Sequence, residues 1–230
     1  MLAAFVQLDR RSASPLLPPA LLRRPGIAGA NLVAAVNGAT TNTSIFFFAL
    51  FAHHVLGLST LAAGIGFLPC NGAVVVGSAL AGWLAGRHGY RLPTIVGMGV
   101  VAGGLLLLAR LSPAAEYATT LLPGLVVMGF GLGLAQIGLV GAGTAAAPTS
   151  ERGVAAGLLT TSAQIGTAVG LAVLVAVAAA AEAPLAGATS ATLAAGFRVA
   201  FLVAALLAVG GTLLAATTFP RDPTARPRRR

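Results

Sequence analysis

The stretch GWLAGRHGYR, residues 82–91, lies between two long apolar segments and decides how they are connected. Gly89 permits a tight turn, because glycine readily adopts backbone conformations that other residues avoid. Arg87 and Arg91 flank the turn, where their charges anchor at a membrane surface and can contact helix ends or a partner's carboxylate. The stretch predicts that one long helix ends here and that the next begins after a very short turn.

The composition on both sides of this turn is that of a membrane protein. Of the 230 residues, 57% are hydrophobic and 8% are charged, and the mean hydropathy is +0.92. An ordinary soluble domain has about 25% charged residues. The 30 glycines and 13 prolines also suit membrane helices, in which small residues let backbones approach closely. We therefore expect an all-α integral membrane protein.

Six stretches are long and apolar enough to cross a bilayer, which takes about 20 residues per helix. They comprise residues 27–53, 60–86, 93–111, 119–147, 153–181 and 197–219. We therefore predict one six-helix unit at 27–219, followed by a basic cytoplasmic tail at 220–230.

The N-terminal segment has a different character. Residues 1–8 are apolar but too short to span, and Asp9, Arg10 and Arg11 follow directly. A signal peptide has the opposite order, with its charge before its apolar stretch. We expect residues 1–26 to be the cytoplasmic end of a preceding helix and a basic, proline-rich linker.

The arginines predict the orientation. Of the 14 basic residues, all of them Arg, only Arg110 and Arg198 fall on the side of the predicted spans away from the termini. Positive charge favours the cytoplasmic side, so we expect a multi-pass protein of the cell (inner) membrane with both termini in the cytoplasm. The net charge of +9 fits retention beside anionic lipid in the bilayer better than nucleic-acid binding, because the arginines do not interleave with aromatic residues on any soluble face.

The turn at residues 82–91 resembles the second copy of the loop motif of the major facilitator superfamily. In that motif a Gly, an Asp-Arg pair, a Gly and a further basic residue join the second and third helices of a six-helix half. Gly82, Arg87, Gly89 and Arg91 match it. Gly86 stands where the family has Asp, so the role of that acid is missing from this chain.

Further stretches, in the same order along the chain, are similar to the fourteen-helix EmrB/QacA-type drug:proton antiporters of that superfamily. They comprise residues 14–32, 63–69, 122–133 and 152–166. The resemblance implies a six-transmembrane-helix half of a major-facilitator fold, the last six helices of fourteen. It also implies a separate N-terminal transporter half as partner, small-molecule drugs as substrates and protons that pass through the other half.

Polar residues inside the predicted spans are the candidates for the substrate path, because such groups are costly in a membrane. Asn37, Thr41 and Ser44 form one stripe at helical spacing. By analogy with the family, the first and fourth helices of each half line the central cavity. That analogy selects Asn37, Thr41 and Gln136.

Aromatic residues follow this stripe, at positions 46, 47, 48 and 51. They could stack on a flat apolar or cationic drug, and Phe48 is our candidate for the substrate path. Contact with lipid is an equal alternative.

Asn71 and Gln164 lie in the middle of the second and fifth spans, where interhelical hydrogen bonding is favoured over substrate contact. His53 and His54 lie at the end of the first span, and an exposed interfacial pair is the favoured interpretation.

The sequence offers no enzyme motif and no group of metal-ligand residues, and we expect no catalytic residue and no cofactor. None of the five acidic residues falls within a predicted span. A proton-driven cycle would therefore need a carboxylate from elsewhere. Two functional hypotheses remain: half of a proton-coupled multidrug efflux antiporter, or a transport-inactive truncated membrane protein or assembly partner. A self-associated passive pore is a weaker third, because one half supplies only one wall of the cavity.

Overall fold

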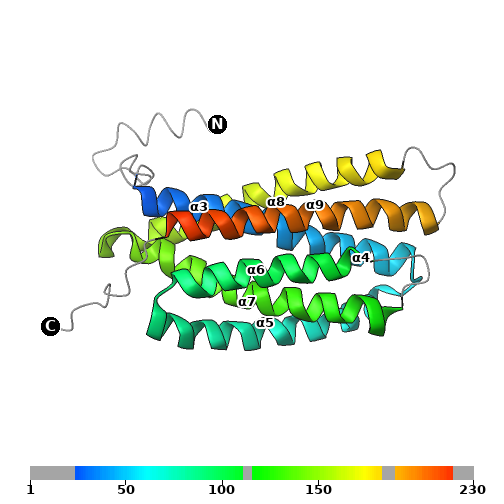
Figure 1. Ribbon diagram of the computed structural model, residues 1–230, viewed down its shortest axis with the longest axis horizontal. Helices are drawn as coiled ribbons and strands as arrows, with labels where there is room; N and C mark the ends of the chain where they lie inside the picture. The colour runs from blue at the N-terminus through cyan, green and yellow to red at the C-terminus, as the bar shows by residue number, and fades with distance from the viewer. Residues whose placement is uncertain (1–23, 111–115, 183–189, 220–230) are drawn as a thin grey trace.

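The computed structural model describes residues 24–110, 116–182 and 190–219, and every long element in these ranges is a helix (Figure 1). The predictions for residues 1–23 and for the tail at 220–230 lie outside the described residues. The elements are α3 (Pro25–Asn37), the π-helical turn η1 (Gly38–Asn42), α4 (Thr43–His54), α5 (Thr60–His88), α6 (Arg91–Leu108), η2 (Tyr117–Leu121), α7 (Leu122–Ala145), η3 (Thr149–Glu151), α8 (Arg152–Glu182) and α9 (Ser190–Thr218).

Six helical segments are long and apolar enough to cross a membrane. They correspond one for one to the six predicted spans, so the all-α, six-span prediction is confirmed. The predicted start of the last helix, at 197, was wrong, because α9 begins at Ser190. Gly196 is buried inside α9, against the side chain of Glu182 at the end of α8.

The helices run side by side along the long axis of the molecule (Figure 1). α7 packs against α5 and α6, α6 packs against α9, and α8 packs against α3 and α9. Arg24, Arg87, Arg91 and Arg152 lie where α3, α6 and α8 begin and α5 ends, and we call this the Arg end. The opposite end, where α4 finishes at His53 and His54, is called the His end.

Glycines set the close packing of α7. A side chain at Gly133 would overlap the carbonyl oxygen of Val74 on α5, and one at Gly131 would overlap the backbone of α6 at Gly97 and Val101. The backbones of α7 and both neighbours therefore touch, as small residues allow in membrane helices.

The apolar core consists of two main clusters with a polar layer between them along the first span. The larger cluster, toward the His end, contains Phe47 and Phe51 of α4 together with Phe197 and Phe201 of α9. The other, toward the Arg end, includes Val33 of α3. Between them the buried residues are polar: Asn37, Thr40, Thr41, Thr43 and Ser44. This layer is the natural place to look for a site.

Candidate functional site

The polar layer is built around η1, where the first span changes from α-helix to one π-helical turn. Its hydroxyls bond back to the helix itself. Thr40 Oγ1 donates to the carbonyl oxygen of Val36 at 2.9 Å, and Ser44 Oγ donates to that of Thr40. Hydroxyls that bond in this way are satisfied without water but compete with the regular helix ladder. Such π-turns often mark functional sites.

A chain of hydrogen bonds connects this layer to α7. Thr41 Oγ1 donates to Asn37 Oδ1 at 3.2 Å, and Asn37 Nδ2 donates to Gln136 Oε1 over a long 3.5 Å. Asn37 and Thr41 are buried, whereas Gln136 is exposed. The structure thus brings together three of the four predicted substrate-path residues. The NH₂ group of Gln136 has no partner among the described residues and is the outward end of the chain.

Three residues of the aromatic run, Phe47, Phe48 and Phe51, are buried in the core, whereas Phe46 is 43% exposed. Phe47 and Phe51 pack edge-to-face against Phe197, with ring centroids 5.7 and 5.8 Å apart, so they belong to the core. Phe48, the predicted path residue, is buried in the same core cluster and lies beside Phe67 of α5, with 5.6 Å between the ring centroids. It lines a groove at the His end and does not join the chain at Asn37.

A polar seam joins the first span to α8. Ser162 Oγ donates to Asn31 Oδ1 at 2.8 Å, and Asn42 Nδ2 donates to Thr167 Oγ1 at 3.0 Å. Between these contacts a side chain at Gly166 would overlap the backbone of Ala35. Close backbone approach and interhelical hydrogen bonds together fix α8 against the first span.

The loop motif at residues 82–91 forms the predicted turn. Gly89 has φ +74°, which favours glycine, and its N–H donates to the carbonyl oxygen of Ala85 at 3.1 Å. Gly82 is exposed on α5, and a side chain there would meet open space.

The two arginines of the motif have different partners. The Arg91 guanidinium donates to the carbonyl oxygen of Ala216 on α9 at 2.8 Å, while its Nε is buried without a hydrogen bond among the described residues. Arg87 is exposed and its guanidinium carbon lies 4.1 Å from the ring centroid of Trp83. The family pattern has an acid at position 86, next to Arg87. In this chain position 86 is Gly, and Arg87 contacts the ring of Trp83.

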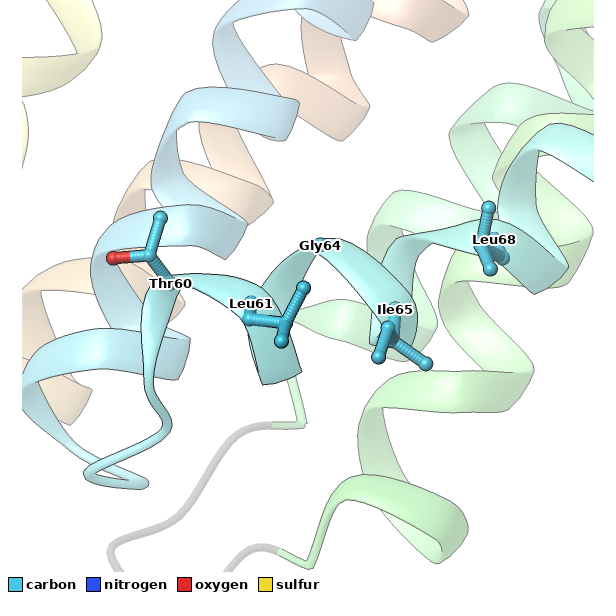
Figure 2. A pocket seen from close by; sticks show the side chains of 5 residues that line it. All are labelled: Thr60, Leu61, Gly64, Ile65 and Leu68. Atoms are coloured by element: carbon cyan, nitrogen blue, oxygen red, sulfur yellow. The ribbon is translucent and has the colours of Figure 1, made fainter.

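Asn71 and Gln164 are exposed, on α5 and α8 respectively. Neither forms a hydrogen bond within the described ranges, so an interhelical bond for them stays a prediction. Their helices are also the least buried spans, with 11% of the most apolar stretch of α5 and 22% of that of α8 buried. A hollow of about 580 Å³ near the start of α5 is lined by that helix alone (Figure 2).

Sequence reasoning missed three features of the site: the π-turn, the seam to α8 and the contact of Arg87 with Trp83. The run of five polar residues at 40–44 was a usable signal for the first, because neighbouring hydroxyls compete for helix carbonyls. Within the described residues no group of three or more His, Cys, Asp or Glu side chains could hold a metal ion.

Six spans packed around a buried polar layer define a multi-pass membrane protein. Its fold is that of half a transporter. It superimposes on a bacterial homologue of the human drug peptide transporters PepT1 and PepT2 with a TM-score of 0.70 at 16% identity, over 88% of this chain and 44% of the other. The inward-open xylose transporter XylE from E. coli gives a TM-score of 0.64 at 20% identity, over 86% of this chain and 49% of the other.

The family follows from the sequence comparison. The model of the Major Facilitator Superfamily matches residues 6–171, and the chain belongs to that superfamily. It is similar to the cephamycin export protein CmcT of Amycolatopsis lactamdurans, 35% identical over 74% of this chain and 35% of that protein. The puromycin resistance protein pur8 of Streptomyces alboniger is 32% identical over 74% of this chain and 35% of its own length. The chain thus spans about a third of the length of these curated relatives.

Proposed function

We propose that this chain supplies the six-helix C-terminal half of a fourteen-helix, proton-coupled multidrug exporter, whose substrates are apolar or cationic small molecules. Relatives named as antibiotic export and resistance proteins, and its membership of a transporter superfamily, support export rather than enzymatic chemistry. Alternating access would then be a rocking of two halves about a site near the bilayer midplane.

The observation that carries the proposal is the pair of unpartnered amides on α5 and α8. An amide facing lipid costs free energy, because nothing in the hydrocarbon can accept its hydrogen bonds. Asn71 and Gln164 are exposed in the middle of spans, and Thr160 and Thr161 of α8 are exposed near Gln164. A second transporter half packed over α5 and α8 would give these groups protein partners.

The chain from Thr41 through Asn37 to Gln136 is the proposed substrate contact. The two buried residues hold the amide of Gln136, and Gln136 offers its free NH₂ group to a ligand. A buried network of this kind positions its exposed end without long flexible side chains. Selectivity would then depend on cavity shape and on this single amide.

The coupling proton would be bound by the other half. The acids among the described residues are Glu116, Glu151 and Glu182, which lie at helix ends or in short turns. None can act as a carboxylate at mid-depth.

The orientation follows from the arginines. The described residues include four arginines at the Arg end and two, Arg110 and Arg198, toward the His end. We infer that the Arg end faces the cytoplasm, with both termini on that side of the cell membrane.

A transport-inactive assembly partner is the second candidate. The observation that favours it is the loop motif, in which Gly86 replaces the acid and Arg87 lies on Trp83. A loop without its acid could fold and insert without supporting the conformational cycle.

Ethidium efflux separates the two candidates. Cells lacking their own pumps express this chain alone, a matching N-terminal half alone, or both. We expect efflux that a protonophore stops only when both halves are present. Correct membrane insertion and co-purification of the halves without efflux would favour the inactive partner.

The proposed substrate contact has its own test in the paired protein. Replacing Asn37, Thr41 and Gln136 by Ala should change the range of drugs that the cells resist. The matched control replaces Thr144, Thr212 and Thr217 by Ala, whose hydroxyls bond only to their own helices. An unchanged resistance range in the first variant would remove these residues from the substrate path.

A further inference from the structure

A second concave site lies at the His end, between α4 and α5. This groove, which we call the aromatic groove, has a volume of about 390 Å³, and its principal side chains are Phe46, Phe48, His53, His54, Thr60 and Phe67. Small-molecule sites in proteins have volumes of about 300–1,000 Å³. Thr60 and Gly64 also line the open hollow on α5, so the groove continues onto the face of that helix (Figure 2).

Aromatic rings form the walls of the groove. The rings of Phe48 and Phe67 are tilted by 34° with centroids 5.6 Å apart, and they come from opposite helices. Phe46 is 43% exposed, so part of its ring is free for contact. Phe48 itself is 3% exposed, so the exposed ring of Phe46 is the surface on which a planar partner can stack or meet an edge.

The polar atom of interest is Nε2 of His53. Nδ1 of this ring lies 3.1 Å from the carbonyl oxygen of Leu58. A carbonyl oxygen can only accept, so in the neutral ring Nδ1 carries the proton and Nε2 is left with a lone pair. The contact with Leu58 therefore sets the tautomer and leaves Nε2 of His53, a residue that lines the groove, as an acceptor.

The charges around the groove narrow the class of ligand further. Neither a carboxylate nor an arginine is among its lining residues, so nothing there selects a permanently charged molecule. A lipid acyl chain would contact the rings but would leave the acceptor at His53 unused.

From this geometry we propose that the aromatic groove binds a neutral, planar aromatic molecule that carries one O–H or N–H donor. The exposed ring of Phe46 and the partly buried ring of Phe67 contact the planar body, and the donor bonds to Nε2 of His53. The site is separate from the chain at Asn37 and does not require the other transporter half, so its binding test is independent of the transport test.

The experiment compares two ligands that differ in one hydrogen bond. Radiolabelled 2-naphthol and 2-methoxynaphthalene are titrated at pH 8 onto the full chain in phosphatidylcholine nanodiscs. Empty nanodiscs give the partition into lipid, which is subtracted. We expect saturable binding of both, with 2-naphthol bound about tenfold more tightly, the usual effect of one such hydrogen bond.

Two variants test the assignment of the donor's partner. His53→Phe keeps a ring of similar shape and should remove the tenfold preference while 2-methoxynaphthalene still binds, which also shows that the variant is folded. His88→Phe, at the other end of α5, should leave both affinities unchanged. Equal affinities in the unaltered chain, a preference that survives His53→Phe, or binding no greater than that of empty nanodiscs would overturn the proposal. The last outcome would mean that lipid chains hold the groove.

Discussion

α7 and α5 are neighbouring helices of similar apolar character. Apart from Gly66 and Gly77, which face Tyr117 and Phe130, the glycines of α5 have surroundings opposite to those of α7. In the α7 span half of the most apolar stretch is buried, against 11% in α5. A side chain at Gly129, Gly131 or Gly133 of α7 would overlap a neighbour, whereas side chains at Gly72 and Gly82 of α5 would meet open space. Glycine thus permits close packing of α7 against its neighbours, whereas these glycines of α5 lie on an exposed surface.

The difference shows which surfaces of this chain are complete. α7 packs against α5 and α6 of this chain, and its glycines permit backbone contact on both sides. α5 resembles α8, which also exposes an amide and open glycines at Gly153 and Gly157. Small residues gain packing only when another helix approaches them, so open glycines on α5 and α8 fit a partner outside these helices.

The largest expected difference in stability comes from adding one methyl group to each helix. Gly133→Ala on α7 would force a carbon atom into the carbonyl of Val74, and overpacking against backbone costs about 3 kcal/mol or more. Gly72→Ala on α5 should leave stability unchanged. Thermal unfolding of both variants in the same nanodiscs measures the effect. If both unfold at the same temperature, the packing of α7 is looser than described.

The next prediction tests whether the exposed face of α5 contacts the other transporter half. Gly72 of α5 and Gly103 of α6 both meet open space in this chain. If α5 faces the other transporter half and α6 faces lipid, Gly72→Leu should lower ethidium efflux of the paired protein about thirtyfold, through about 2 kcal/mol of overpacking. Gly103→Leu should leave efflux unchanged. Equal effects of the two substitutions would show that α5 has no special partner.

Hydropathy was enough to predict six spans and nearly all their boundaries, because length and apolar composition decide whether a helix can cross a membrane. It could not predict that Phe47 and Phe51 pack against Phe197 while Phe48 packs beside Phe67. That division depends on where Phe197 and Phe67 lie, and both are far away in the sequence.

The substrate-path role of the polar residues stays a prediction, but the structure shows where they lie. Residue type and position along the spans selected Asn37, Thr41 and Gln136, which the structure brings into one hydrogen-bonded chain. Helical periodicity does not predict the π-turn beside them, and the run of polar residues at 40–44, whose hydroxyls compete for helix carbonyls, was the signal that it leaves out.

The loop motif joins α5, which is largely exposed, to α6, which is more deeply buried. Arg91 lies at the start of α6. Its guanidinium joins the start of α6 to Ala216 near the end of α9. Arg91→Leu should lower the free energy of unfolding by about 1.5 kcal/mol, the lower end for a hydrogen bond to a charged group. Arg110→Leu, an exposed arginine at the other end of α6, is the control in the same unfolding measurement. A loss as large in the control would indicate a general effect of charge.

Substitution of Arg87 has the smallest expected effect on stability, because Arg87 is exposed at the end of α5. Its contact with Trp83 is exposed, and cation–π contacts of this kind contribute about 0.5–1 kcal/mol. Trp83 is the single tryptophan of the chain, so its fluorescence reports this contact directly. Arg87→Leu should change the emission of Trp83 and hardly change the unfolding temperature, while Arg152→Leu, at the start of α8, should change neither.

The same measurement then extends to the paired protein. If the other half supplies the carboxylate that Gly86 does not, Arg87 would leave the ring when the halves combine. The emission of the unaltered chain should then move toward that of Arg87→Leu. An emission that stays the same on pairing would mean that Trp83 remains the partner of Arg87 in the assembled protein, and that this loop works without an acid.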